Sequence, residues 1–147
     1  MVKFRGNIPA KIDSQGRLKI PTEHKELIDE IYQSDALYIT SFNGDRILIY
    51  PLKEWEAVEA KVEQMPSSEA RDKFIEYSGY WGKEATIDKQ GRVLIQQHLR
   101  KAAEVVEGID VAVIWNRNHF AVWNDDKMRA SITSEPLTKK EIEQLGI

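Results

Sequence analysis

The alternation of apolar and polar positions in the first third of the chain predicts four strands and one helix. The expected strands are rich in β-branched and aromatic residues and span 4–12, 18–20, 36–42 and 46–50. Pro9 favours an edge position or a bulge for the first of them. A single apolar face predicts a helix over 23–32, with Thr22 as its N-cap. Asn43 and Gly44 predict a tight hairpin turn between the last two strands.

Helical spacing replaces strand spacing after residue 51. One apolar stripe predicts a helix that begins near Leu52 and ends before Pro66. A second helix is expected to follow an N-cap at Ser67, and Gly79 and Gly82 are expected to break it. These two helices connect the two halves of the chain.

From residue 83 the order of the first half recurs. The expected strands span 84–87, 93–95, 111–115 and 119–123, with a helix over 97–106 after the second of them. A short helix is expected after Asn124, and Thr138 with Glu141 resembles a capping box in the polar tail. The predicted divisions are 4–54 (first repeat), 55–82 (connecting helices), 83–128 (second repeat) and 129–147 (polar C-terminal tail).

Two nearly identical nonapeptides occupy matching places in the two halves. Ile-Asp-Ser-Gln-Gly-Arg-Leu-Lys-Ile at 12–20 and Ile-Asp-Lys-Gln-Gly-Arg-Val-Leu-Ile at 87–95 agree at six of nine positions. Average composition would give roughly half a match in such a window. We therefore infer an internal duplication, in which each half forms hairpin, helix, hairpin and helix. The fold class is mostly β with α (α+β), with the halves packed around a pseudo-twofold axis.

Each nonapeptide is expected to form the tip of a β-hairpin. The residues expected to shape the two loops are Asp13, Gly16, Asp88 and Gly91, because a glycine permits the turn and an aspartate accepts local backbone N–H bonds. In a single copy, the arginine four residues after the aspartate is adequately explained as an ion pair that fixes the hairpin register. Two copies favour a second interpretation, in which Arg17 and Arg92 reach outward to phosphates or guanine edges.

Composition places the chain among ordinary globular proteins. It has 147 residues, of which 41% are hydrophobic and 31% charged, so one chain of this length can bury its own core. The absence of cysteine excludes disulfides and thiolate metal sites. No apolar run approaches the roughly 20 residues of a membrane span, and the N-terminus has no signal-peptide pattern. We expect a cytoplasmic protein without membrane contact.

The net charge of −3 argues against a nucleic-acid partner, but the distribution of charge changes this picture. Basic residues gather around both nonapeptides: Lys3, Arg5, Lys11, Arg17 and Lys19 near the first, and Lys83, Lys89, Arg92, Arg100 and Lys101 near the second. The connecting segment 52–72 is acidic. Because salt screens distant charges, a local basic patch can bind a polyanion despite the acidic total.

The sequence gives no support for catalysis, a metal or a cofactor. His24, His98 and His119 lack the spacing of metal ligands, and no glycine-rich phosphate loop is present. Asp13 and Asp88 have a basic residue four positions on, which keeps them ionised and unsuitable as proton donors. An enzyme is therefore the least favoured class.

Several segments, taken together, resemble the MraZ family of bacterial transcriptional regulators. The first is Phe4-Arg5-Gly6, followed by Ile12-Asp13-x-x-Gly16-Arg17-Leu18-x-Ile20-Pro21. The second is Asp88-Lys89-Gln90-Gly91-Arg92-Val93-Leu94-Ile95 with His98-Leu99-Arg100, and Phe74-Ile75-Glu76-Tyr77-Ser78-Gly79 precedes it. The resemblance extends over about 1–130 in order and spacing.

This resemblance implies a fold, a partner and a set of contacts. The fold would be two tandem AbrB-like swapped-hairpin halves, each a double-split β-barrel, assembled into a ring-like homo-oligomer. The partner would be double-stranded DNA, at direct repeats upstream of the division and cell-wall gene cluster, which implies a nucleoid-associated protein. The DNA contacts would be Arg17 and Arg92, with Lys19, Arg5, Lys11 and Lys89 as further basic candidates. The alternative is a structural or antitoxin-like module whose loops bind a protein.

Overall fold

The computed structural model describes residues 4–147, and within that range it contains eight strands and six helices. The strands are β1 (Phe4–Ala10), β2 (Arg17–Lys19), β3 (Ala36–Thr40), β4 (Ile47–Pro51), β5 (Lys83–Thr86), β6 (Arg92–Leu94), β7 (Val111–Arg117) and β8 (His119–Asn124). The helices are α1 (Thr22–Tyr32), α2 (Leu52–Glu63), α3 (Glu69–Trp81), α4 (Gln97–Ala103), α5 (Asp125–Ser134) and α6 (Lys139–Gln144). The α+β class predicted from the sequence is confirmed.

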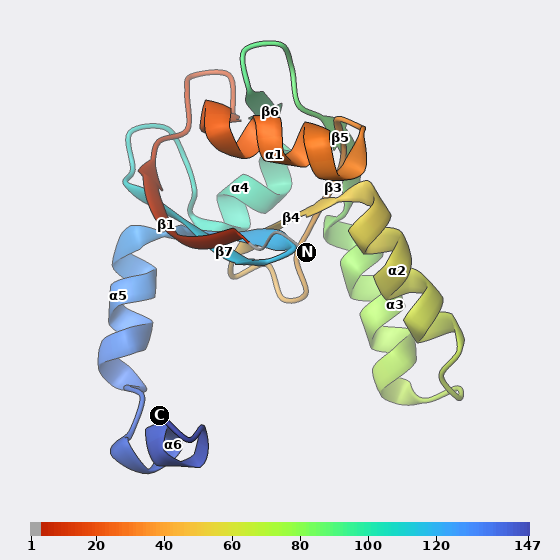
Figure 1. The fold of residues 1–147 in the computed structure, drawn as a ribbon, viewed down its shortest axis with the longest axis vertical. Coiled ribbons are helices and arrows are strands. Elements are labelled where there is room, and N and C mark those ends of the chain that lie inside the picture. The colour runs from red at the N-terminus through yellow and green to blue at the C-terminus, as the bar shows by residue number, and fades with distance from the viewer. Residues whose placement is uncertain (1–3) are drawn as a thin grey trace.

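Six strands form one antiparallel sheet in the order β1-β7-β8-β4-β3-β5, and β2 pairs with β6 in a separate two-stranded ribbon. Strands β1 to β4 of the first half correspond in order to β5 to β8 of the second half. When each strand of the sheet is replaced by its counterpart, the same order results, read from the other edge. The order therefore supports the predicted duplication, while the division into AbrB-like repeats remains a prediction. In Figure 1, α1 and α4 lie on one side of the sheet, and α2, α3 and α5 extend from the other side.

The strand pairing predicted around the first nonapeptide is wrong. We expected 4–12 and 18–20 to form a hairpin, but β1 pairs with β7 along seven residues, and β2 pairs with β6. Locally, the loop is closed by an isolated bridge between Ile12 and Leu18 and by a hydrogen bond from the Asp13 N–H to the Arg17 carbonyl at 3.0 Å. The long pairing with β7 satisfies more backbone groups than a local hairpin around this loop would. Pro9 lies in the edge strand β1, where a missing N–H is tolerated.

The main core lies between the sheet, helices α1 and α4, and the inner face of the β2–β6 ribbon. The ribbon contributes Leu18 and Val93, which are directly opposite each other and fully buried. Helix α1 contributes Ile28 and helix α4 contributes Leu99, both also fully buried. Burial of side chains of this size stabilises the fold by about 1.5–3 kcal/mol each. The core therefore fixes the ribbon onto the body of the protein.

A smaller cluster covers the opposite face of the sheet. Leu48 and Tyr50 of β4 pack with Trp55 of α2, and Phe74 of α3 lies against them. The side chains of Tyr50 and Trp55 meet edge-on at 5.1 Å between ring centroids. This cluster attaches the α2–α3 pair to the sheet.

Helix ends differ in detail from the sequence predictions. Pro21, not Thr22, is the N-cap of α1, and no side chain caps that end. Ser68, not Ser67, caps α3, where its hydroxyl accepts a hydrogen bond from the Arg71 N–H at 3.1 Å. Helix α3 also continues through Gly79 and ends at Trp81, so only the second predicted glycine break is present. The capping box of Thr138 and Glu141 is confirmed.

The predicted divisions at 54/55 and 128/129 fall inside α2 and α5. These helices therefore continue across the expected boundaries. Among residues 4–147, no helix has the length and apolar character needed to cross a bilayer.

Candidate nucleic-acid interface

The β2–β6 ribbon presents one outward face. Its register pairs Arg17 with Leu94, Leu18 with Val93 and Lys19 with Arg92. Opposite residues of an antiparallel pair point to the same side, and the Leu18–Val93 pair points into the core. The outward side chains are therefore Arg17, Lys19, Arg92 and Leu94. Figure 1 shows this ribbon and its loops at the opposite end of the molecule from α6.

The first loop is held by the carboxylate of Asp13. Its Oδ1 accepts hydrogen bonds from the backbone N–H groups of Gln15 and Arg17, both at 2.9 Å. Its Oδ2 accepts a bond from Arg17 Nε at 3.1 Å. The Gly16 N–H donates to the Asp13 carbonyl at 3.0 Å, in a turn where Gly16 has φ +82°. One aspartate thus fixes both the turn and the direction of the arginine.

The second loop repeats the backbone arrangement. Asp88 Oδ1 accepts from the N–H groups of Gln90 and Arg92 at 2.8 and 2.9 Å. The Gly91 N–H donates to the Asp88 carbonyl at 3.0 Å, and Gly91 has φ +78°. The side chains differ, because within residues 4–147 the guanidinium of Arg92 forms no hydrogen bond or ion pair with Asp88. Arg92 is therefore the less constrained of the two arginines.

Hydrogen bonds between the two nonapeptides join the loops into one unit. The Ile20 N–H donates to the Gly91 carbonyl at 2.7 Å, and the Ile95 N–H donates to the Gly16 carbonyl at 3.1 Å. The ammonium of Lys19 also donates to the Gln90 carbonyl. Each loop is thus held by the strand that follows the other loop.

The hydrogen bonds also determine the ionisation of the two aspartates. The backbone N–H of Arg17 is the largest cause that lowers the pKa of Asp13 below its usual value. The backbone N–H of Arg92 has the same effect on the pKa of Asp88, and the charges of Arg17 and Arg92 lower it further. Both carboxylates are therefore ionised acceptors at neutral pH, which suits a loop-shaping role and not proton donation.

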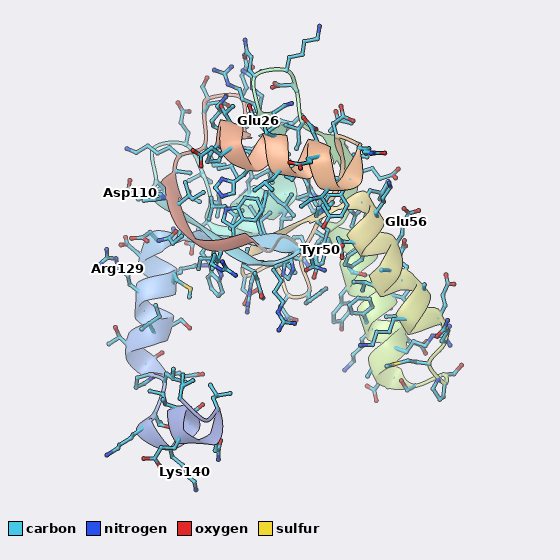
Figure 2. All side chains as sticks on the ribbon, viewed as in Figure 1. Glu26, Tyr50, Glu56, Asp110, Arg129 and Lys140 are labelled. Carbon is cyan, nitrogen blue, oxygen red and sulfur yellow. The ribbon has the colours of Figure 1, made fainter. Side chains whose placement is uncertain are left out.

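The structure brings some of the predicted contact residues together and separates others. Lys19 and Lys89 are exposed at the ribbon and at the tip of the second loop. Lys11 precedes the first loop but pairs with Asp110 at 3.7 Å, and Figure 2 shows Asp110 at the side of the molecule. Arg5 lies near the start of β1 opposite Asn116, several residues of strand away from the loops. Arg5 is therefore not part of the cluster around Arg17 and Arg92.

Two residues near the loops were not singled out as site residues. Arg100 of α4 lies against the first loop: a Cβ added at Gly16 would be 2.5 Å from Arg100 Cζ. Arg100 Nε donates to the Ile95 carbonyl at 2.8 Å, so this side chain supports the ribbon from behind. Leu94 is 55% exposed on the outward face. Its exposure follows from the strand register, which the sequence did not reveal.

The three histidines lie against aromatic rings. His24 stacks on Trp115, His98 stacks on Trp81 and His119 stacks on Tyr50, with centroids 4.5, 5.5 and 4.3 Å apart. Among residues 4–147, no group of three or more histidine, aspartate and glutamate side chains is placed to hold a metal ion.

Comparison with known proteins gives a consistent set of relatives. A family model described as "MraZ protein, putative antitoxin-like" matches residues 4–76. The chain is 41% identical over 148 residues to the transcriptional regulator MraZ of Koribacter versatilis, covering 98% of this chain and 99% of that protein. It is 40% identical over 144 residues to the transcriptional regulator MraZ of Acidobacterium capsulatum, covering 97% of each. The protein of the same name from Syntrophobacter fumaroxidans is 35% identical over 130 residues, 88% of this chain and 84% of its own length.

Proposed function

The chain belongs to the MraZ family, and from that premise we propose that it regulates transcription by binding DNA. The resemblance inferred from the sequence is thereby confirmed. The relatives are named as transcriptional regulators and not as enzymes. The two aspartates support the same conclusion, because their carboxylates are occupied in holding loops.

The observation that carries the proposal is the outward face of the β2–β6 ribbon. Arg17, Lys19 and Arg92 lie on this face, above a core that holds the ribbon in place. A two-stranded β-ribbon fits the major groove of B-DNA, where arginine can bond a guanine edge or a phosphate in bidentate fashion. Within the Arg17 guanidinium, it is Nε that donates to Asp13, which leaves the terminal nitrogens for such a contact.

The distribution of charge removes the objection raised by the net charge of −3. The α2–α3 pair, which contains most of the acidic segment 52–72, extends away from the ribbon in Figure 1. Charges separated by more than a Debye length, about 8–10 Å in physiological salt, interact weakly. The ribbon can therefore bind a polyanion while the acidic helices face elsewhere.

We further propose that binding occurs through several copies of the chain at once. Each chain offers two arginine loops, and a ring-like homo-oligomer would present many of them to direct repeats. Linked sites raise the effective concentration of each subsequent contact, so weak single contacts combine into firm binding. The proposed sites are direct repeats upstream of the division and cell-wall gene cluster, which would place the protein at the nucleoid.

Arginine substitutions test this assignment directly. We expect Arg17→Ala and Arg92→Ala each to weaken binding to that upstream DNA by about 5- to 150-fold, which corresponds to the loss of one good arginine contact of about 1–3 kcal/mol. The measurement is a gel-shift titration, with size-exclusion chromatography to show that assembly is unchanged. Lys140→Ala removes the same charge from α6, far from the ribbon in Figure 2, and is the control. Unchanged affinity in both arginine variants would contradict the assignment.

The alternative is a module whose loops bind a protein, and the antitoxin-like wording of the family description is the observation that favours it. A protein partner would need to match a face that carries Arg17, Lys19 and Arg92 and only one apolar side chain, Leu94. Interfaces between proteins are usually depleted in charge at their centre and enriched in aromatic residues. The ribbon face is closer in character to a surface for nucleic acid.

A further inference from the structure

We propose that Leu94 contacts the 5-methyl group of a thymine in the DNA groove that receives the β2–β6 ribbon, and so contributes to sequence preference. This inference rests on the proposed function, because it assigns a role to one side chain of the same surface. It concerns Leu94 alone, the apolar member of an outward face that otherwise carries Arg17, Lys19 and Arg92.

Leu94 is exposed where its neighbours in the strand are buried. Val93 and Ile95 on either side are fully buried, whereas Leu94 is 55% exposed. Its side chain points outward because it is directly opposite Arg17 in the register. The core does not require a leucine at this position, and the alternation of a half-buried strand places polar residues on its outward face.

Comparison of the two nonapeptides shows what Leu94 replaces. The equivalent position of the first nonapeptide is Lys19, whose ammonium donates to the Gln90 carbonyl at the second loop. By the same correspondence, Leu94 lies beside the first loop, where the Ile95 N–H donates to the Gly16 carbonyl. A leucine cannot donate a hydrogen bond or neutralise a phosphate. The first loop therefore has an apolar neighbour at the place where the second loop has a cation.

The chemistry of the major groove gives this apolar side chain one specific partner. Hydrogen-bond donors and acceptors line the groove edges of the bases, and the thymine methyl is their apolar feature. Arg17, opposite Leu94, is held by Asp13 and is proposed to contact a guanine edge or a phosphate. Leu94 would then meet a thymine next to the nucleotide that Arg17 contacts. Phosphate contact alone would not select a leucine at this position, because phosphates bind cations and N–H donors.

Uracil substitution tests the inference, because uracil lacks only the 5-methyl group of thymine. The wild-type protein is first titrated with the upstream DNA to define its footprint. Each thymine in the footprint is then replaced in turn by uracil, and affinity is measured by competition. We expect one position in each bound repeat to lose about three- to fivefold in affinity, the effect of removing one methyl group from an apolar contact. Leu94→Ala should abolish the difference between thymine and uracil at that position.

Two further variants make the result specific. Leu137→Ala removes the same atoms from a leucine that is 63% exposed after α5, and should leave the uracil effect intact. Leu94→Lys recreates the residue of the first nonapeptide and should increase affinity for unrelated DNA while losing the methyl effect.

The possible failures are distinguishable. Absence of any DNA binding by the wild-type protein would overturn the proposed function together with this inference. Specific binding with no sensitivity to uracil, or an unchanged uracil effect in Leu94→Ala, would overturn this inference alone. A change in oligomeric state of Leu94→Ala in size-exclusion chromatography would also overturn it, because Leu94 would then lie between copies of the chain.

Discussion

Asp13 and Asp88 show how much of each loop depends on one carboxylate. Each accepts two backbone N–H groups from the residues that follow it, and Asp13 also accepts a bond from the Arg17 side chain. These contacts require the ionised form, because a protonated carboxyl group is a weaker acceptor. The same bonds lower the pKa of both groups.

The lowered pKa values predict a dependence of stability on acidity. A group whose pKa is lower in the folded chain contributes stability above its unfolded pKa, near 3.8 for aspartate, and this contribution is lost as the pH falls through the folded value. We expect Asp13→Asn with Asp88→Asn to be less stable than wild type at pH 7. The difference should narrow as the pH falls below about 4.

Urea unfolding between pH 7 and pH 2.5 measures this difference. Glu143→Gln is the control, because it neutralises an exposed acidic residue of α6, at the opposite end of the molecule from the ribbon in Figure 1. Its difference in stability from wild type should not narrow in this way as the pH falls. If the free energies of unfolding of wild type and the double variant differ by the same amount from pH 7 to pH 2.5, the charge of the carboxylates does not stabilise the loops.

The turn chemistry of the nonapeptides could be predicted from the sequence, but their strand partners could not. Aspartate and glycine at fixed spacing specify backbone contacts within five residues, and the structure contains those contacts in both copies. The side-chain bond from arginine to aspartate is present in the first copy, between Arg17 Nε and Asp13. The partner of β1 is β7, more than 100 positions later, and many strands in the chain are equally suitable by composition. The exposure of Leu94 was missed for the same reason, because it depends on which strand β6 pairs with.

The second loop lies so close to Ile20, the residue that follows β2, that there is no room for a side chain at Gly91. A Cβ at Gly91 would lie 2.9 Å from the carbonyl oxygen of Ile20, a backbone atom that cannot move without shifting β2. The atoms nearest to a Cβ at Gly16 belong to the end of the Arg100 side chain, which could move aside at the cost of its hydrogen bond to the Ile95 carbonyl. The two loops therefore differ in how closely another element approaches them.

We predict that Gly91→Ala is more destabilising than Gly108→Ala. Both glycines have positive φ, +78° and +83°, so each alanine would pay about 1–2 kcal/mol for a left-handed backbone. Gly108 has nothing within 4 Å of an added Cβ, whereas Gly91 has the Ile20 carbonyl. We expect an additional loss of about 1–3 kcal/mol for Gly91→Ala in urea unfolding. If both variants lose the same stability, the backbone at Ile20 can shift to accommodate the added Cβ, and the prediction is wrong.

Across the whole molecule, each half completes the sheet of the other. Strand β1 pairs with β7, and β5 pairs with β3, so the outer strands of the sheet are both attached to the opposite half. The core includes buried residues of both ribbon strands. In both halves, the first strand pairs with a strand of the other half. This interleaving explains why the first strand of each half does not pair with the strand after its nonapeptide, whereas the predicted β3–β4 and β7–β8 hairpins do form.

The response of the whole assembly to salt separates the proposed DNA partner from a protein partner. The logarithm of affinity for B-DNA falls with the logarithm of salt concentration, with a slope of about −0.9 per neutralised phosphate. For about four neutralised phosphates, affinity should fall roughly a hundredfold between 50 and 200 mM salt. Fluorescence anisotropy with labelled upstream DNA measures the slope, and Arg92→Ala should reduce it by about one unit if Arg92 binds phosphate. A flat response would favour the alternative module.

The joining of two similar halves in one chain has a consequence for orientation on DNA. A dimer of identical subunits has a true twofold axis and reads a palindrome, because both of its tips carry the same residues. Here the equivalent positions hold Lys19 and Leu94, so the ribbon has distinguishable ends. We expect each subunit to lie on the duplex in one polarity only. Copies that all point the same way match sites that are arranged head to tail. If one of these sites is reversed, its base composition stays the same, but the affinity of the protein for the DNA should fall.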